Sequence, residues 1–328
     1  MVNGSSSLVV SAPGKMMISG EYAVLAGAEA IVAAVNRRAR ASVRGGDAPT
    51  APAEARAAFR QVEAALGALG HEPTVDVSEL RTKDAKLGLG SSAAAAAASA
   101  GLALIEHGHE ISSEAERRRV FDAAWRGHMD VAPIGSGADV AASVFGGFLR
   151  FLRRGDDIQV SPLAWPAGLR AHVVWTGQEA RTSTFLERVA ALADAEPAKH
   201  TQLMQALKDE AARFVRAVEK HDTSGVLAST DAYGRAMGAL GDAAEIAIVN
   251  DTLRKVAELA ARAGGAAKPS GAGGGDVALA LCADASAEER FRALCSDCKF
   301  TLLSIELGAP GVRREAAMET RDAGEARA

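Results

Sequence analysis

A mixed arrangement of helices and strands in two domains is predicted for this chain from its length and its pattern of apolar residues. Segments of strand and helix character alternate irregularly, and no internal repeat is present. The 328 residues are enough for two ordinary domains or one large one. We place the change of domain near residues 155–170, which gives domains of residues 1–165 and 166–312 and a polar tail, residues 313–328, expected to be disordered.

Alternating apolar and polar residues, bounded by glycine and proline, mark the strands. The first is LVVSA at residues 8–12, which Pro13 and Gly14 are expected to close. Further strands are predicted within residues 20–35, 73–80, 134–154, 169–177, 277–283 and 299–307.

Apolar residues at helical spacing mark the helices. The helix at residues 112–129 has a serine at its start, Ser112 or Ser113, that can cap it. Further helices are predicted over residues 53–70, 91–107, 185–220, 224–264 and 286–295, with a short one inside 134–154.

Composition excludes several classes of protein. The chain is 48% hydrophobic and 24% charged, and its net charge of −4 gives no general attraction to nucleic acid or an anionic membrane. No secretory signal opens the chain, and the apolar run near residues 93–105 is too short to span a bilayer. We therefore expect a cytoplasmic protein with neither nucleic acid nor membrane as a partner.

Three cysteines, Cys282, Cys295 and Cys298, suit a reducing compartment better than a disulfide framework. Cys295 and Cys298 form a C-x-x-C pair, but no second pair accompanies it. A zinc site would therefore lack ligands, and ordinary thiols on a partly buried helix are the interpretation that remains.

A glycine-rich turn runs into a row of alanines in KLGLGSSAAAAAAS, residues 86–99. Gly88, Gly90 and Ala93 fit the spacing of a dinucleotide-binding turn, but the preceding ELRTKDAK is too charged for the buried strand that such a site needs. Glycines let an anion approach the backbone, and the amides of a helix N-terminus point at it. The stretch therefore indicates either a phosphate site or a tight turn capped by serine.

Two further stretches favour phosphate chemistry. SAPGKMMISGEYAVLAG, residues 11–27, places Lys15 after Pro-Gly, where its charge could reach a phosphoryl group in transfer. KPSGAGGGD, residues 268–276, is a glycine loop before an apolar strand, a pattern that permits close approach of backbone or phosphate. A solvated lysine and a flexible surface loop are the simpler alternatives.

Together and in this order, the three stretches resemble the GHMP kinase superfamily, which includes galactokinase, homoserine kinase, mevalonate kinase and phosphomevalonate kinase. The resemblance covers essentially the whole chain. GEYAVL, GSGADVAASVFGG, WTGQEARTST and KPSGAGGGD are most similar to the phosphomevalonate kinases, whereas mevalonate kinases usually carry histidine at the position of Tyr22. The implied fold is α+β in two domains: an N-terminal one with a left-handed βαβ crossover, an exception to the usual hand, and a ferredoxin-like C-terminal one.

The resemblance implies ATP and Mg²⁺ as cofactors. Ser92 is the implied metal contact. The implied nucleotide contacts are Lys86, Gly88, Leu89, Gly90, Ser91, Ser92 and Ala93.

By the same resemblance, Lys15 and Asp139 are the residues that meet where the phosphoryl group is transferred, although Asp139 could also be a simple helix cap. The match is partial at Glu179 and Arg181, where the family often has proline or serine. The expected acceptor contacts are Lys15, Tyr22, Ser136, Gly137, Arg181, Thr182, Ser183 and Gly273.

The chain departs from mevalonate kinases at one position. These supply a Mg²⁺-binding glutamate about eleven residues before the aspartate, and His128 stands there in this sequence. Because neutral imidazole is a poor Mg²⁺ ligand, either Ser92, nucleotide and water hold the metal, or a nearby acid such as Asp130 substitutes. His128 is expected to be structural or to face the substrate.

The implied activity is transfer of the ATP γ-phosphate to (R)-5-phosphomevalonate, giving mevalonate 5-diphosphate and ADP. Mevalonate kinase, or another small-molecule kinase of the superfamily, is the alternative. A non-catalytic ligand sensor on the same scaffold is the alternative from another class, but Lys15, Ser92 and Asp139 are all retained. Small molecules are the expected partners of a monomer or homodimer.

Overall fold

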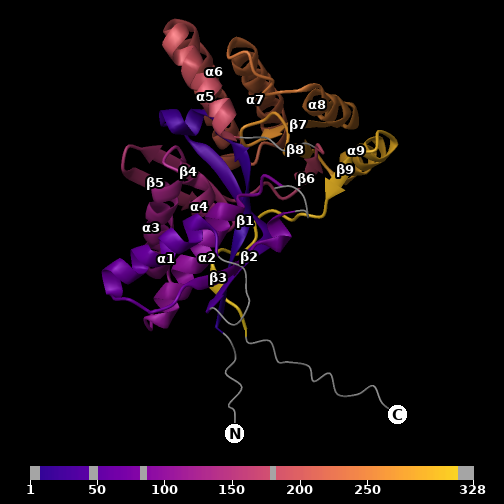
Figure 1. The fold of residues 1–328 in the computed structure, drawn as a ribbon. Helices are drawn as coiled ribbons and strands as arrows, with labels where there is room; N and C mark the ends of the chain where they lie inside the picture. Colours follow the sequence, from indigo (N-terminus) through magenta and orange to yellow (C-terminus); the bar gives the residue numbers. More distant parts are fainter. Residues whose placement is uncertain (1–7, 44–50, 82–86, 178–181, 317–328) are drawn as a thin grey trace, which may run out of the picture.

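Two antiparallel sheets, one for each half of the chain, form the framework of the protein (Figure 1). The computed structural model describes residues 8–43, 51–81, 87–177 and 182–316. The first sheet has the order β10-β1-β2-β4-β5, with β3 paired to β2 as well, and the second has the order β7-β8-β6-β9. The strands are β1 (Val9–Ser19), β2 (Ala30–Val43), β3 (Pro73–Asp76), β4 (Phe148–Arg154), β5 (Asp157–Pro162), β6 (Arg170–Trp175), β7 (Gly265–Ser270), β8 (Val277–Cys282), β9 (Thr301–Leu303) and β10 (Arg313–Arg314).

The strand β1 continues to Ser19, so the predicted end at Pro13 and Gly14 is wrong. Its register with β2 shifts between Pro13 and Lys15, as in a β-bulge, which accommodates a proline without breaking the strand. A Cβ on Gly14 would lie 2.5 Å from both the Leu80 side chain and the Leu89 carbonyl oxygen, so only glycine fits this close approach. Lys15 therefore emerges from within the sheet, beside the loop that carries Leu89.

Four helices pack in the first half of the chain: α1 (Ala53–Leu66), α2 (Ser91–Glu106), α3 (Glu114–Val131) and α4 (Ala138–Phe145). Two 3₁₀ turns occur in the same half: η1 (Ala23–Ala26) between β1 and β2, and η2 (Ser78–Leu80) between β3 and α2. The alanine helix α2 lies against α1, α3, α4 and the sheet, and Ala93 to Ala98 are fully buried. Small side chains allow neighbours on every side, and a helix that is apolar all round is a buried one. Ser113 caps α3, as predicted, by accepting a hydrogen bond from the Glu116 amide at 3.2 Å.

The strands β3 and β4 both pair antiparallel with β2, on its edge away from β1. They therefore run parallel to each other, and α2, α3 and α4 form the connection between them. This connection joins two parallel strands that pair with opposite ends of the same edge of β2.

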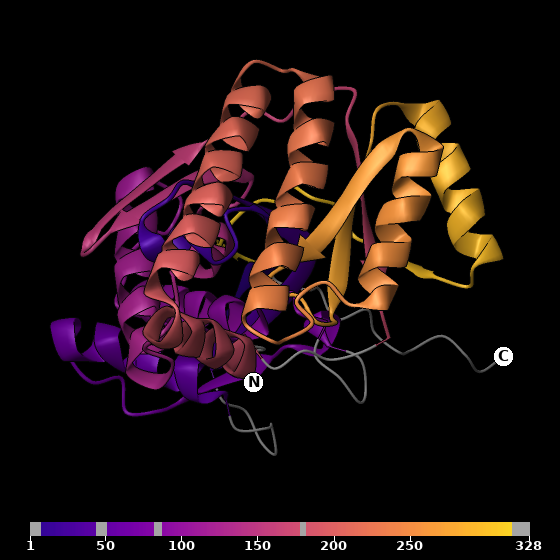
Figure 2. The same cartoon turned by 90° about the horizontal axis from the view of Figure 1, so that it is seen from above.

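Helices cover the second sheet as well: α5 (Thr182–Ala195), α6 (Pro197–Glu219), α7 (Thr223–Ala243), α8 (Asp251–Ala263) and α9 (Ala285–Asp297). Figure 2 shows α6 and α7 lying side by side, with α7 between α6 and the strands β7 and β8. The two long helices predicted over 185–220 and 224–264 are each broken once. Pro197 begins α6, and Asn250 caps α8 by accepting a hydrogen bond from the Leu253 amide at 2.9 Å.

Three other predicted elements differ in extent. The strand predicted over residues 299–307 is formed only at Thr301–Leu303, and that over 73–80 ends at Asp76, where η2 follows. The glycine loop predicted from Lys268 starts later, because Lys268, Pro269 and Ser270 complete β7. Pro269 is tolerated in this strand because β7 is an edge strand of its sheet.

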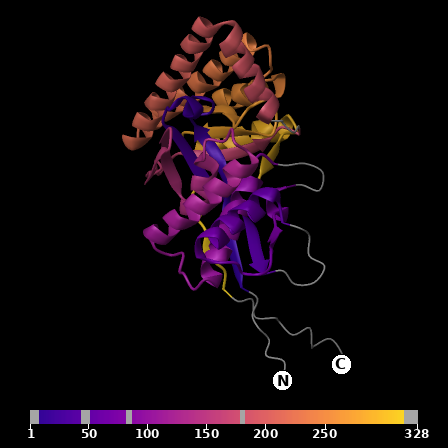
Figure 3. The same ribbon diagram turned by 60° about the vertical axis from the view of Figure 1, so that its left-hand side comes forward.

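The chain returns to the first sheet at its end, so the predicted tail is wrong at its first residues. Val312 is fully buried in the first core, and Arg313 and Arg314 pair with β1. The buried Arg38 holds this return, since its guanidinium donates to the carbonyl oxygens of Pro310 at 2.8 Å and Gly311 at 2.7 Å. Figure 3 shows this late segment beside the early strands.

The cysteines are thiols, as expected. Burial raises the pKa of Cys295 to about 11, and Cys298 is exposed at the end of α9. Within the described ranges no cluster of three metal-binding side chains occurs, and no helix is long and apolar enough to cross a membrane.

Gly127 allows α3 to cross α1 closely, because a Cβ there would lie 2.3 Å from the Ala58 amide nitrogen. We expect Gly127→Ala to lower the free energy of unfolding by about 1–3 kcal/mol, as overpacking does. Denaturant titration followed by circular dichroism measures this. Gly238→Ala is the control, since Gly238 lies within α7 with its nearest neighbour 3.7 Å from the new Cβ. There, helix propensity should stabilise by up to about 1 kcal/mol, and equal effects at both positions would contradict the packing argument.

Candidate active site

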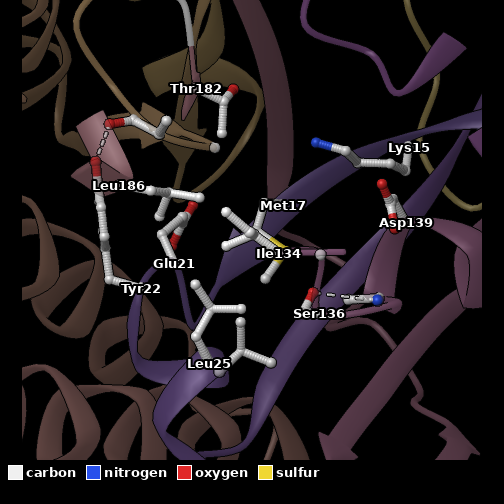
Figure 4. A pocket seen from close by; sticks show the side chains of 15 residues that line it. Lys15, Met17, Glu21, Tyr22, Leu25, Ile134, Ser136, Asp139, Thr182 and Leu186 are labelled. Carbon is white, nitrogen blue, oxygen red and sulfur yellow. Dashed lines mark hydrogen bonds between the residues drawn. The ribbon is translucent and has the colours of Figure 1, made fainter. Parts of the chain in front are cut away.

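A cavity of about 180 Å³ lies where the two halves of the chain meet (Figure 4). The turn after β1, the N-terminus of α4, the start of α5 and the glycine loop after β7 all contribute to it. Its lining residues are Lys15, Met17, Glu21, Tyr22, Val24, Leu25, Ile134, Gly135, Ser136, Ala138, Asp139, Thr182, Leu186, Gly271 and Ala272. Segments predicted to carry function from four distant parts of the sequence therefore share one cavity.

Lys15 and Asp139 lie next to each other on one side of this cavity in Figure 4. The Lys15 amide donates to the Leu89 carbonyl oxygen at 2.8 Å, and its Nζ lies 3.5 Å from the Gly88 carbonyl oxygen. Asp139 is the second residue of α4 and is half-buried. The structure thus brings the two predicted transfer residues together, and Lys15 connects the cavity with the glycine turn before α2.

The glycine turn presents the start of α2 toward Lys15. Gly88 and Gly90 both have positive φ, 70° and 72°, which glycine adopts without strain. The flanking Leu87 and Leu89 are buried and anchor the turn. The N-terminal amides of a 16-residue helix then point outward with the positive end of the helix dipole.

Predicted nucleotide contacts occupy this turn. Gly90 is the residue before α2, Ser91 is buried, Ser92 is half-buried and Ala93 is fully buried. Lys86, the other predicted nucleotide contact, lies outside the described residues. Asp276, at the end of the second glycine loop, packs against Gly88, where a Cβ would lie 2.8 Å from its own. The loops from the two halves of the chain are therefore in contact.

A strained turn, Gly20–Tyr22, forms another wall. Tyr22 has φ 61°, a conformation that costs a bulky residue free energy and persists only where surrounding contacts fix it. Its hydroxyl donates to the Ala272 carbonyl oxygen in the glycine loop. Burial raises the pKa of Tyr22 well above its usual value, so the group stays a hydrogen-bond donor at neutral pH.

A buried ion pair between Lys268 and Glu21 fixes the position of this turn. The Lys268 ammonium donates to Glu21 Oε1 and, at 2.9 Å, to the Pro269 carbonyl oxygen, and both charged side chains are at most 2% exposed. Tyr233 presents its ring to Lys268 at 5.4 Å and donates its hydroxyl to the Glu21 carbonyl oxygen at 2.8 Å. Burial lowers the pKa of Lys268, and the adjacent Glu21 carboxylate opposes that shift.

The remaining predicted acceptor contacts divide into two groups. Ser136 and Thr182 line the cavity, and Gly137, with φ 90°, turns the chain into α4 against the Trp125 ring. Ser183 is exposed outside the lining, and Gly273 packs on the Ile248 carbonyl oxygen while its neighbours Gly271 and Ala272 line the cavity. Arg181 lies outside the described residues.

Neither His128, at the position of the Mg²⁺-binding glutamate of mevalonate kinases, nor Asp130, the acid considered as its substitute, lines the cavity. His128 is buried in α3 beneath Gly135, with its ring carbon 3.7 Å from where a Cβ on that glycine would stand. Asp130 is exposed and accepts a hydrogen bond from Gln61 of α1 at 2.8 Å. Of the two acids that line the cavity, Glu21 and Asp139, it is Asp139 that lies beside Lys15, the residue in contact with the glycine turn (Figure 4).

Sequence reasoning missed several residues of the site. Glu21 belongs to the stretch at residues 11–27 that predicts phosphate chemistry. Its partner Lys268 is 247 positions away, in a segment predicted to be a glycine loop that in fact completes β7. A second hollow of about 560 Å³, lined by Arg153 and Arg154, adjoins the cavity and shares Leu25 and Ser136 with it. Arg153 donates to the Gly135 carbonyl oxygen at 2.9 Å, so it also supports the turn before α4.

Comparison with known families agrees with this geometry. The sequence matches the GHMP kinase N-terminal domain over residues 55–147 and the GHMP kinase C-terminal domain over residues 226–299, which together cover half of the chain. The chain therefore belongs to the GHMP kinase family, and the two-domain fold that the resemblance implied is confirmed.

Two relatives of known name are similar to the chain over most of its length, one a phosphomevalonate kinase and the other a mevalonate kinase. A phosphomevalonate kinase of Streptomyces sp. strain CL190 is 29% identical over 86% of this chain and 91% of its own length. A mevalonate kinase of Aeropyrum pernix is also 29% identical, over 91% of this chain and 96% of its own. The structure of Streptococcus pneumoniae phosphomevalonate kinase in complex with phosphomevalonate and AMPPNP superposes with a TM-score of 0.77 and 18% identity, covering 91% of this chain and 99% of that one.

Removing one member of the buried pair should cost far more than removing both. Lys268→Met leaves a buried carboxylate without its counter-ion, so we expect the free energy of unfolding to fall by about 3–5 kcal/mol. Glu21→Gln combined with Lys268→Met removes both charges and should recover a large part of that loss. Denaturant titrations of the three proteins give these values.

The exposed pair of Lys255 and Glu258, with its atoms 3.1 Å apart, provides the control. Lys255→Met should change stability by at most about 1 kcal/mol because solvent screens the pair. A double variant at positions 21 and 268 that is less stable than Lys268→Met alone would contradict the uncompensated-charge explanation.

Proposed function

We propose that the protein transfers the γ-phosphate of ATP to (R)-5-phosphomevalonate, giving mevalonate 5-diphosphate and ADP. The observation that carries this proposal is the position of Lys15. Its ammonium lies between the glycine turn at the start of α2 and the cavity, next to Asp139. A fixed cation between a nucleotide site and an acceptor site is what phosphoryl transfer requires, because charge on the phosphoryl oxygens must be neutralised there.

ATP would lie with its phosphates over the turn of Gly88, Leu89, Gly90 and Ser91, on the N-terminus of α2. The free amides and the helix dipole supply the positive potential that phosphate needs. Mg²⁺ takes oxygen ligands and keeps several waters, so the Ser92 hydroxyl and the nucleotide phosphates suit it without a cluster of acids. The metal would supply positive charge that offsets the charge of the phosphates.

The acceptor would span the cavity and its neighbouring hollow. Phosphomevalonate carries an anionic group at each end, and the site offers Lys15 at one end and Arg153 and Arg154 at the other. Between them, Leu25 and Ile134 are partly exposed apolar side chains that suit a hydrocarbon segment. Polar contacts would come from Tyr22, Ser136, Gly137 and Thr182, and from Arg181 and Ser183 if the start of α5 closes on the phosphate.

In the proposed reaction an acceptor phosphate oxygen attacks the γ-phosphorus, and the bond to the oxygen that bridges the β- and γ-phosphates breaks. That oxygen leaves with its electron pair as part of ADP. The second pKa of a phosphate monoester is near 6, so at pH 7 the attacking oxygen is mostly ionised already. No strong base is needed, and Asp139 serves to orient Lys15, which lowers the repulsion between the two anions.

Mevalonate is the second candidate acceptor, favoured by the equal identity to a mevalonate kinase. Its hydroxyl must lose a proton as it attacks, and Asp139 stands in the cavity where it could accept that proton. The two candidates therefore assign different chemistry to the same carboxyl group.

Variants at these two positions separate the candidates. If phosphomevalonate is the acceptor, Lys15→Ala should lower kcat/KM by a factor of about 10²–10³, because it removes transition-state charge stabilisation. Asp139→Asn, which keeps the shape and loses the charge, should cost far less. A coupled assay of ADP release, run with mevalonate and with phosphomevalonate, measures both.

The reverse order, with Asp139→Asn the more damaging variant on phosphomevalonate, would refute the assignment of Asp139. Faster turnover of mevalonate than of phosphomevalonate by the unaltered protein would replace the proposed acceptor by the second candidate. Turnover of neither would remove both.

Gly90→Ala tests the nucleotide site. Its Cβ would lie 2.8 Å from Lys15 Cγ, so the substitution must displace the lysine chain and the turn together. We expect a KM for ATP raised at least tenfold and a lower kcat. Gly70→Ala is the matched control, since Gly70 has a similar positive φ of 77° with open space around it. Equal effects on KM would show that backbone strain alone is responsible.

A further inference from the structure

A further cavity, with a volume of about 870 Å³, lies away from the candidate active site and its neighbouring hollow. It is bounded by the start of α3, the β4–β5 hairpin and the end of α4. None of its lining residues lines the acceptor cavity. Its volume is within the range of about 300–1,000 Å³ of small-molecule sites. The residues that line it are Glu114, Ala115, Arg117, Arg118, Phe145, Gly146, Gly147, Phe148, Leu149, Val160, Pro162 and Leu163.

One wall of this cavity is apolar and held in place. The Phe148 ring stacks on Trp165 with centroids 4.6 Å apart, and Phe145 packs against Phe121 with centroids 5.7 Å apart. Leu149 is buried at the floor. A wall of packed aromatic and aliphatic side chains favours a hydrocarbon chain or ring, whose burial gains about 25 cal/mol per Å².

The opposite wall carries charge from α3. Arg118 is occupied, since it lies 3.6 Å from the Asp122 carboxylate and donates to the Ile158 carbonyl oxygen at 3.3 Å. Arg117 differs, because it lines the cavity and is only half-buried, and its side chain has no hydrogen bond or ion pair in the part of the chain that the structure describes. A guanidinium has five N–H donors, and an unpaired one at a cavity wall is best satisfied by an anionic oxygen, which can accept from two of them.

Glu114 also lines the cavity and is exposed at the start of α3. Its carboxylate repels an anion, so it weakens binding but does not occupy Arg117, since no ion pair between the two residues is present. The two residues therefore affect the same ligand in opposite directions.

We propose that this cavity is a second small-molecule site, which binds an amphipathic anion: a phosphate or carboxylate on an apolar chain. The anionic group contacts Arg117, and the chain lies on Phe145 and Phe148. The site and the candidate active site are at opposite ends of α4, which carries Asp139 in its first turn and ends at Phe145. At 1.5 Å rise per residue those ends are roughly 10 Å apart.

Octyl phosphate is a suitable probe, because it joins one phosphate to one short chain. Calorimetric titration of the full chain should show binding with one site per molecule, whereas octanol and inorganic phosphate should each bind at least tenfold more weakly. Lys15→Ala should leave the affinity for octyl phosphate unchanged, because Lys15 belongs to the other cavity.

Substitutions on α3 give the decisive comparison. Arg117→Gln should weaken octyl phosphate binding at least tenfold, and Glu114→Gln should strengthen it severalfold. Arg119→Gln is the matched control, since Arg119 is on the same helix but pairs with Glu116 at 3.5 Å outside the cavity. Ala115→Trp fills the cavity from an exposed position and should abolish binding.

Three results would overturn the proposal: no binding of octyl phosphate, equal affinity in the Arg117→Gln and Arg119→Gln variants, or loss of binding in Lys15→Ala. None of these results depends on which acceptor the active site uses.

Discussion

The buried ion pair between Glu21 and Lys268 is the contact on which the candidate site depends. It joins the turn after β1 to β7, the strand that precedes the glycine loop in the second half of the chain. Two charges out of water are tolerated only with several hydrogen bonds. Here the Pro269 carbonyl and the Tyr233 ring support Lys268, whereas Glu21 Oε2 is buried without a hydrogen-bond partner among the described residues. Only the glycine loop after β7 continues directly from a residue of the pair. The turn at Gly88–Gly90 is linked to it through the Lys15 amide, which donates to the Leu89 carbonyl oxygen, and through the contact of Asp276 with Gly88.

The strand β1 carries that constraint to the chemistry. It pairs with β2 along its length and with β10 at Val10 and Ser11. The Met17 amide donates to the Ser270 hydroxyl at 3.1 Å, and the Met17 carbonyl oxygen accepts from it at 2.8 Å. Lys15 lies two residues from Met17, beside the turn at the start of α2. Because the backbone of Lys15 is fixed in this strand, its ammonium can reach only a small region. A charge fixed in this way stabilises a transition state more than a mobile charge does, since it need not reorganise during the reaction.

Local pattern was enough to predict the elements that use short-range signals. The glycine turn, the alanine helix and the Ser113 cap follow from motifs whose residues are close in sequence. The proximity of Lys15 and Asp139 was implied only by the family resemblance, because the two residues lie far apart in the sequence. The pair of Glu21 and Lys268 could not be predicted, because its members are 247 positions apart and each looks like a solvated charge in its own segment. Arg38 and the return of residues 310–314 to β1 were missed for the same reason: the partners meet only once both sheets have formed.

The return of the chain to its first sheet also bears on how the protein is made. Ser11 and Glu315 are hydrogen-bonded across 304 positions, and Val312 fills a place in the first core. During synthesis, the N-terminal half therefore leaves the ribosome with one edge of β1 unpaired and its core incomplete until residues 312–314 have emerged. Such an edge is open to wrong partners until then, so the first sheet cannot be completed before the second half of the chain has been synthesised.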